Sequence, residues 1–348
     1  MDISLFFFAD SAAADGYRLL LESARFADTH GLTAVWTPER HFHPFGGLYP
    51  NPAVTGAAVA AVTERVAVRA GSVVAPLHHP LRIAEEWSVV DNLSHGRAGV
   101  SFASGWHARD FALRPETYAD RRSAMVDTIA TVRRLWRGEE VEFPDGAGGK
   151  PALRIFPAPV QPELPVWITS AGSTDTFRAA GRLGAGVLTH LLGQDRAALG
   201  RNIAAYREEF AAVHGDATRA HVTLMLHTML GAGRDRVRDQ VREPFSAYLR
   251  SSMDLIARTA SAVLPAGFDV DRLPDRDKDF LVAHAFDRYF TSSGLFGTVA
   301  DGVATAGSLR DLGVDEIACL IDFGVPHDEV LASLRHLADL HEETGTGG

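Results

Sequence analysis

Short apolar runs alternate along the chain with longer stretches in which apolar residues recur every three or four positions. The short runs are typical of strands buried on both faces, and the longer stretches are typical of amphipathic helices. Eight runs predict strands, at residues 3–8, 33–37, 66–75, 98–103, 165–169, 187–191, 222–230 and 316–321. Helical patterns predict helices at residues 16–30, 51–63, 81–93, 118–136, 173–183, 196–214 and 328–341.

Eight strand and helix alternations predict an α/β fold, a single (β/α)8 TIM barrel rather than an open doubly wound sheet. Two connections are longer than such a barrel needs. Residues 141–161, after the fourth strand, are rich in Gly and Pro and predict an excursion with a small hairpin. Residues 234–296, after the seventh strand, predict a helical insertion. We expect the barrel to occupy residues 1–343 and residues 344–348 to form a flexible tail.

Composition narrows the class of protein. The 348 residues are 46% hydrophobic and 22% charged, as in globular proteins. No apolar run approaches the roughly 20 residues that span a bilayer, and no signal peptide is evident, so we expect a cytoplasmic protein without a membrane partner. Cys319 is the only cysteine, which excludes disulfides within the chain. The net charge of -10 disfavours binding to nucleic acids.

The active face of a TIM barrel is built from the loops that follow its strands. Polar residues just past five predicted strands are therefore candidates for one site: Glu39, Arg40, His41, His43, His78, His79, Ser104, His107, Gly172, Ser173, Thr189 and His190. The histidines lack the spacing of metal ligands on a helix and have few carboxylates beside them. We expect no metal, and imidazoles that move protons around an organic ligand.

Three segments carry the clearest ligand signals. The strand at 98–103 ends in Ser104 and Gly105, where the backbone can approach a ligand or simply turn. Gly71 and Ser72 lie inside a strand, which indicates either a bulge or close approach of a planar ligand. Residues 169–174 lead into a helix and predict either a phosphate site or an ordinary N-cap at Ser173.

Four segments, at residues 35–42, 71–80, 96–111 and 165–174, together resemble the bacterial luciferase-like flavin monooxygenase superfamily. The sequences WTPERHF and SGWHARDF are most similar to its mupirocin-type branch, which is associated with polyketide and nonribosomal-peptide biosynthesis. The resemblance covers nearly the whole chain. It implies a TIM barrel that uses a reduced flavin, in a pathway of secondary metabolism.

The resemblance also implies roles for individual residues. Gly71 and Ser72 would lie against the isoalloxazine ring, Ser104 would bond its polar edge, and Thr189 would approach it from the sixth strand. The phosphate would be held by a further group of residues: Ala171, Gly172, Ser173 and Tyr118. Catalytic roles fall to His41, His107 and Arg40. Luciferases carry their catalytic histidine where this chain has Arg40, so His41 and His107 are the expected proton carriers.

The activity implied is that of a two-component monooxygenase. A separate flavin reductase would supply FMNH2, and the co-substrate O2 would form a flavin C4a-(hydro)peroxide. Hydroxylation or Baeyer-Villiger insertion would follow on an acyl or aminoacyl intermediate, free or tethered to a carrier protein. The family implies a homodimer. The alternatives are a deazaflavin (F420)-dependent hydride-transfer enzyme on the same barrel and a non-catalytic flavin-binding protein.

Overall fold

The computed structural model describes residues 1–11, 13, 15–251 and 273–345. Eight parallel strands close into the predicted barrel, because each pairs with its neighbour and the last pairs with the first. In barrel order they are β1 (Asp2–Phe6), β2 (Ala34–Thr37), β3 (Ala67–Val74), β4 (Ala98–Ala103), β7 (Val166–Ser170), β8 (Gly186–His190), β9 (Val222–Leu230) and β11 (Glu316–Leu320). Each lies within a few residues of its predicted position.

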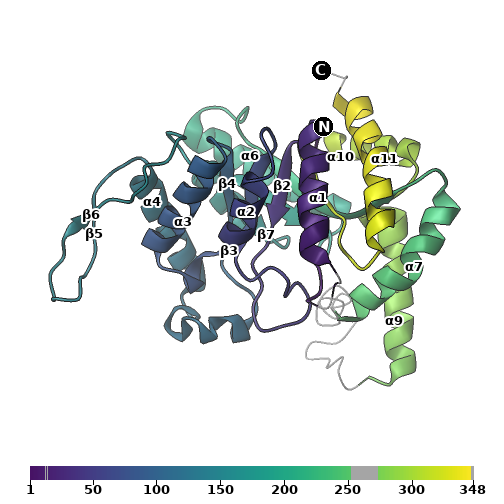
Figure 1. The fold of residues 1–348 in the computed structure, drawn as a ribbon, viewed down its shortest axis with the longest axis horizontal. Coiled ribbons are helices and arrows are strands. Elements are labelled where there is room, and N and C mark those ends of the chain that lie inside the picture. Colours follow the sequence, from purple (N-terminus) through teal and green to yellow (C-terminus); the bar gives the residue numbers. More distant parts are fainter. Residues whose placement is uncertain (12, 14, 252–272, 346–348) are drawn as a thin grey trace.

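Helices surround the barrel (Figure 1). They are α1 (Gly16–Thr29), α2 (Pro52–Ala60), α3 (Pro80–Leu93), α4 (Arg121–Trp136), α5 (Thr174–Arg182), α6 (Arg196–His214), α10 (Val299–Asp311) and α11 (His327–Gly345). The Asn51 side chain caps α2 by accepting from two backbone N–H groups, with Pro52 at the first helical position. Within the described part of the chain, every helix is too short or too polar to span a bilayer.

Three helix boundaries differ from prediction by three residues or more. The helix predicted at residues 51–63 ends at Ala60. The helix predicted from residue 118 begins at Arg121, because the short turn η3 (Pro115–Thr117) precedes it. The last helix, predicted to end at residue 341, extends to Gly345 and includes residues 344 and 345 of the predicted tail. Thr344 is a buried part of α11, and its hydroxyl donates to the Leu340 carbonyl at 2.8 Å. Residues 346–348 of the predicted tail lie outside the described residues.

Both predicted insertions are present. The first contains an antiparallel hairpin, β5 (Val141–Glu142) with β6 (Ala152–Leu153), which reaches away from the barrel in Figure 1. The second contains α7 (Arg234–Ser251), α9 (Asp275–Arg288), the π turn η6 (Tyr289–Ser293) and β10 (Leu295–Gly297). Residues 252–272 of this insertion lie outside the described residues. Strand β10 was not predicted, and it pairs with the last three residues of β9.

A polar network fills the amino-terminal end of the barrel. The buried Glu316 carboxylate accepts hydrogen bonds from Arg69 at 2.8 Å and Trp36 at 2.9 Å. The Arg69 guanidinium lies between the rings of Trp36 and Trp167, 5.0 and 4.5 Å from their centroids. Burial alone would raise the pKa of Glu316, but the attraction of Arg69 and His221 lowers it. This end is therefore closed by an ion pair and two tryptophans.

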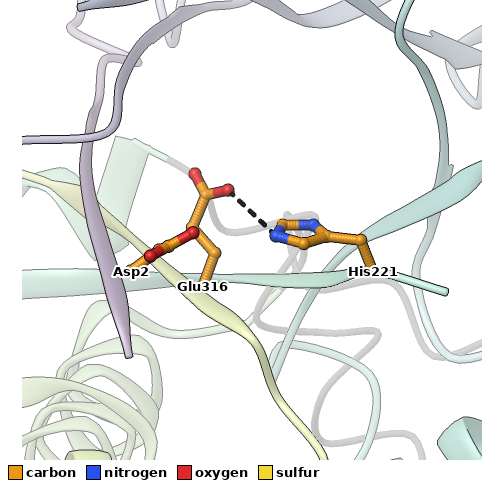
Figure 2. Close-up of side chains that lie close together, drawn as sticks. All are labelled: Asp2, His221 and Glu316. Carbon is orange, nitrogen blue, oxygen red and sulfur yellow. Dashed lines mark ion pairs between the residues drawn. The ribbon is translucent and has the colours of Figure 1, made fainter. Parts of the chain in front are cut away.

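Asp2, His221 and Glu316 bring potential metal ligands within 4.8 Å of one another at the same end (Figure 2). The His221 Nε2 atom is 3.7 Å from a Glu316 oxygen. Arg69 already balances the Glu316 charge, and Asp2 is exposed. These contacts account for the cluster as packing at the closed end of the barrel, opposite the loops that follow the strands.

Candidate active site

Three hydroxyl groups meet inside the barrel near the carboxyl ends of neighbouring strands. Thr169 on β7 shares a hydrogen bond of 2.7 Å with Ser101 on β4, and a shorter one with Ser72 on β3. Parallel pairing of β3 with β4 and of β4 with β7 brings these residues together. Thr169 and Ala103 remain partly accessible. A polar floor that includes Ser72 therefore lies beneath the mouth of the barrel.

The backbone of β3 is irregular at this floor. The Gly71–Ser72 peptide bond is cis, and the register with β4 shifts between Gly71 and Val73. A Cβ atom on Gly71 would lie 2.6 Å from the ring of Phe6 and 3.2 Å from that of Trp36. Barrel packing thus requires glycine here, and the bulge alternative is confirmed. Contact of Gly71 and Ser72 with a flavin ring stays a prediction.

The turn between β7 and α5 has the form of an anion site. Gly172 has φ = 108°, a conformation that favours glycine. Asn202 donates to the Gly172 carbonyl at 3.1 Å and accepts from the Thr174 hydroxyl at 2.6 Å, so α6 braces the turn. Ser173 occupies the N-cap position of α5, but its hydroxyl makes no capping hydrogen bond. Ala171 and Ser173 are exposed at this helix N-terminus, while the Gly172 N–H donates to the Ser170 hydroxyl at 3.3 Å.

Two other residues predicted for the cofactor have structural partners. The buried Thr189 hydroxyl donates to the Ser170 carbonyl at 2.7 Å and accepts from Gln194 at 2.9 Å. Tyr118 packs edge-on against Phe111 at 4.9 Å, and the Arg121 guanidinium lies over its ring. Within the described residues no hydrogen bond joins Tyr118 to the 171–173 turn. Cofactor contacts of Thr189 and Tyr118 stay predictions.

The loop after β4 is fastened by Asp110 to the loop after β2. Asp110 lies in the short turn η2 (Ala108–Ala112), and its carboxylate accepts from Arg40 at 2.9 Å. The Arg40 guanidinium also lies 4.9 Å from the centroid of the Trp106 ring. Arg40 is buried, with 3% of its surface exposed, so it holds the two loops together from inside. A direct catalytic role for Arg40 stays a prediction.

His107 lies in this joined pair of loops. Its Nδ1 is 3.6 Å from the nearer Asp110 oxygen, too far for a hydrogen bond, and is buried without a hydrogen-bond partner among the described residues. Burial, then the nearby Arg40 charge, lower the pKa of His107. The imidazole is therefore neutral near pH 7. It can accept a proton or a hydrogen bond from a molecule that enters the site.

The loops around the mouth expose large apolar side chains. Those with at least a third of their surface accessible are Phe42, Trp106, Leu113 and Tyr118. The His43 ring centroid lies 6.3 Å from that of His107. An apolar rim around polar groups is the usual composition of a site for an organic ligand.

Glu39 connects two of the predicted histidines. One oxygen of its carboxylate lies 2.7 Å from His41 Nε2 and 2.6 Å from His78 Nε2. The other oxygen accepts from the backbone N–H of Val74 at 2.7 Å. His79, the neighbour of His78, is exposed and caps α3 instead. Strand pairing of β2 with β3 brings the two loops into contact.

The strands of the second half contribute further histidines. His227 on β9 lies among the rings of Phe245, Tyr248, Tyr289 and Phe323, at centroid distances of 4.8 to 6.0 Å. Burial lowers its pKa to about 3 and that of His190 on β8 to about 4. The His227 Nε2 atom is buried without a hydrogen-bond partner in the described part of the chain. The search for residues past strand ends missed His227, although alternation along β9 through Thr223 and Met225 places it on the inner face.

Asp322 follows β11 and was also missed. Its carboxylate accepts from the backbone N–H groups of Phe8 and Ala9 at 2.7 and 2.9 Å, and from the Tyr49 hydroxyl at 2.9 Å. Burial raises its pKa to about 7, against these three hydrogen bonds. Asp322 thereby ties the loops after β1, β2 and β11 together at the mouth. In the sequence, the only signal for Asp322 is its position directly after the eighth predicted strand.

Comparison with known proteins places this geometry in a family. The oxygenase component of the flavin-dependent trigonelline monooxygenase of Acinetobacter baylyi is 24% identical over 336 residues, which cover 92% of this chain and 88% of that protein. The crystal structure of the monooxygenase RslO1 from Streptomyces bottropensis matches with a TM-score of 0.79 and 24% identity, over 99% of this chain and 100% of that one.

A third match holds a cofactor. The oxygenating constituent of 3,6-diketocamphane monooxygenase from Pseudomonas putida, a type II Baeyer-Villiger monooxygenase solved with FMN, gives a TM-score of 0.75 at 15% identity, over 99% of this chain and 97% of that one. An F420-dependent secondary alcohol dehydrogenase shares the fold as well. Similarities at these identities establish the fold. The sequence profile of luciferase-like monooxygenases matches residues 1–342, and the chain therefore belongs to the luciferase-like monooxygenase family.

Proposed function

We propose that this protein is the oxygenase component of a two-component monooxygenase that receives FMNH2 from a separate flavin reductase and uses O2. Family membership supports a monooxygenase, and the Acinetobacter relative is itself named as an oxygenase component. A phosphorylated flavin is favoured by one observation: the Ser173 hydroxyl lies at the N-terminus of α5 and makes no capping hydrogen bond.

The residues of the turn fit a phosphate group. Backbone N–H groups of a helix N-terminus attract an anion, and the Ser173 hydroxyl can donate to it. The hydrogen bond from Asn202 fixes the Gly172 carbonyl, so the turn keeps its conformation before a ligand binds. Ser104 and the Ser72 floor would face the ring system. Reduced flavin supplies activated oxygen when it reacts with O2.

The chain's own residues would control protons and water. The neutral His107 imidazole can take a proton at Nε2, and the Asp110 carboxylate, 3.6 Å from the buried Nδ1, would stabilise the imidazolium. His41 is held by Glu39 and serves as the second proton carrier. Phe42 and Trp106 at the rim would cover the site once a ligand fills it, because closing an apolar rim excludes water.

The apolar rim supports a substrate with an apolar body, such as the acyl or aminoacyl intermediate that the mupirocin-type resemblance implies, free or carrier-bound. Both hydroxylation and Baeyer-Villiger insertion require oxygen transfer to such a body. Incubating candidate intermediates with enzyme, reductase and labelled O2, followed by mass spectrometry, distinguishes the two by the position of the added oxygen.

Anaerobic titration tests the cofactor. We expect reduced FMN to bind and its absorbance to change further when O2 is admitted, with one equivalent of oxygenated product per FMNH2 when a substrate is present and continued turnover only when a reductase regenerates FMNH2. Reduced F420 is the matched comparison. Binding of F420 with hydride transfer and no oxygen incorporation would replace the proposal with the deazaflavin alternative. Binding of either cofactor without turnover on any substrate would leave a non-catalytic protein.

We propose that a second copy covers the outer face of α3. Val89 and Leu93 are exposed there, beside Val160, whose backbone N–H donates to Asp91 on the same helix at 2.7 Å. A row of apolar side chains on one helix face is typical of a subunit interface. Light scattering should give a dimer for the native chain and a monomer for Leu93→Lys. Phe280→Lys on the exposed face of α9 is the control and should stay dimeric.

A further inference from the structure

Two imidazoles share one carboxylate oxygen at the edge of the proposed site. His41 Nε2 and His78 Nε2 lie 2.7 and 2.6 Å from the same Oε1 atom of Glu39, while Oε2 is occupied by the Val74 N–H. The Glu39 side chain has no exposed surface. The carboxylate is thus buried between the two rings, and no described group other than these three bonds to it.

This geometry fixes the hydrogen positions. Burial alone would raise the pKa of Glu39, but its hydrogen bonds from His41 and His78 lower it, so the carboxylate is ionised. An ionised carboxylate only accepts hydrogen bonds, and both Nε2 atoms must therefore carry a hydrogen. Each ring is left with Nδ1 as the atom that gains or loses the second proton.

The two histidines differ in their access to solvent. The His78 side chain is 29% exposed and lines a small cavity together with Asn51, Glu86 and Trp87, whereas the His41 side chain is 13% exposed. Charged groups from two other elements face His78. Glu86 on α3 favours its proton, and Arg114, which donates to the His78 carbonyl at 2.8 Å, opposes it. His78 can therefore exchange protons with water beside the cavity.

We propose that Glu39 is a positioning residue that couples the charge of His41 to the charge of His78. One carboxylate attracts the first imidazolium strongly, and a second positive ring on the same oxygen is repelled by the first. Protonation of His78 from solvent therefore opposes protonation of His41. The value of this coupling for turnover rests on the proposed function, because it assigns His41 to proton control, but the coupling itself is a property of the protein without cofactor.

Titration of histidine side chains labelled with ¹⁵N, followed by NMR on the full chain, tests the coupling. In His78→Gln an amide still donates to Glu39 but carries no charge, so we expect the His41 Nδ1 signal to report protonation at a higher pH than in the native chain. Glu39→Gln should shift that midpoint downward and release the fixed tautomer. His79→Gln, which removes the exposed neighbouring histidine, is the matched control and should change neither.

Identical His41 titrations in the native chain and in His78→Gln would overturn the inference. Because His78 is partly exposed, that variant keeps the test decisive even if Glu39→Gln does not fold. The pH dependence of coupled oxygenation gives a second measurement, in which the acidic limb should move with His78→Gln and not with His79→Gln. A protein that shows the NMR coupling but binds no reduced FMN would retract the proposed function and leave the coupling standing. If the protein is an active oxygenase but His41 and His78 titrate independently, the coupling is retracted and the proposed function stands.

Discussion

The Arg40 guanidinium donates to the Asp110 carboxylate at 2.9 Å, and both side chains are buried. The pair joins the loop after β2 to the loop after β4, although the two residues are 70 positions apart in the chain. Arg40 thus fixes one wall of the candidate site. The pair also positions Trp106, whose ring lies against the Arg40 guanidinium, and His107, which lies beside Asp110.

Removal of one partner should be costly. We expect Asp110→Leu to lower the free energy of unfolding by about 3 kcal/mol, because it removes the carboxylate that accepts from the buried Arg40 guanidinium at 2.9 Å. The double variant Arg40→Met, Asp110→Leu should lose less than the sum of the losses in Arg40→Met and Asp110→Leu, since either substitution alone already removes the pair. Urea unfolding of the two single variants and the double variant measures this difference. A loss in the double variant equal to the sum of the two single losses would mean that the charges do not interact.

Coupling of oxygen use to product should depend on His107. His107→Ala removes the neutral imidazole from the mouth, and we expect at least a tenfold lower rate of oxygenation with more hydrogen peroxide released per flavin oxidised. Product and peroxide are measured together in the presence of a reductase. The same measurement on His41→Ala extends the test, and unchanged coupling in both variants would remove both histidines from proton control.

A substitution at Ser173 distinguishes an effect on FMN binding from an effect on the stability of the protein. Aspartate is a favoured N-cap residue, so Ser173→Asp should preserve α5 and the melting temperature. Its negative charge would repel a phosphate, and the Kd for FMN should rise at least tenfold, or about 1.4 kcal/mol. Calorimetric titration with FMN and thermal unfolding give the two quantities. A Kd unchanged in Ser173→Asp would place the phosphate elsewhere.

His227 should make the protein sensitive to acid. Its pKa is about 3 in the folded protein, against an ordinary value of 6.5. As the pH falls below 6.5, the unfolded chain binds a proton at this residue and the folded chain does not, so the free energy of unfolding decreases. Between pH 7 and pH 5 this group alone should lower the free energy of unfolding by about 2 kcal/mol. His227→Phe keeps an aromatic ring in the cage without the titration.

Urea unfolding at the two pH values checks this for the native chain and the variant. The decrease from pH 7 to pH 5 should be smaller by about 2 kcal/mol in His227→Phe. His30→Phe, on the exposed end of α1, is the control and should keep the native decrease. If His227→Phe and the native chain lose the same amount, the imidazole is protonated in the folded state.

Most of the barrel could be predicted from the sequence, because buried parallel strands leave continuous apolar runs and amphipathic helices leave a period near 3.6. Strand β10 escaped because three residues, Leu295 to Gly297, make too short a run to distinguish from helix core. The start of α4 was placed too early because the helical pattern of η3 merges with it.

The site was predicted in part for a related reason. Position after a strand identified Glu39, His41 and His78 as neighbours of the mouth, but a one-dimensional pattern cannot show that one oxygen serves two rings. The same rule passed over His227, which lies within its strand. Contacts that depend on side-chain direction, such as the inward hydroxyl of Thr169, required the closed barrel.

Strand β10 joins the end of the second insertion to the strand from which the insertion starts. Leu230, at the end of β9, pairs with Gly297, and the Gly231 N–H donates to the Gly297 carbonyl at 2.9 Å, so the chain leaves the barrel and returns to it at the same place. This attachment is made by backbone groups alone, so side chains of α7 and α9 that do not pack on β9 can vary without changing the pairing that joins the insertion to the barrel.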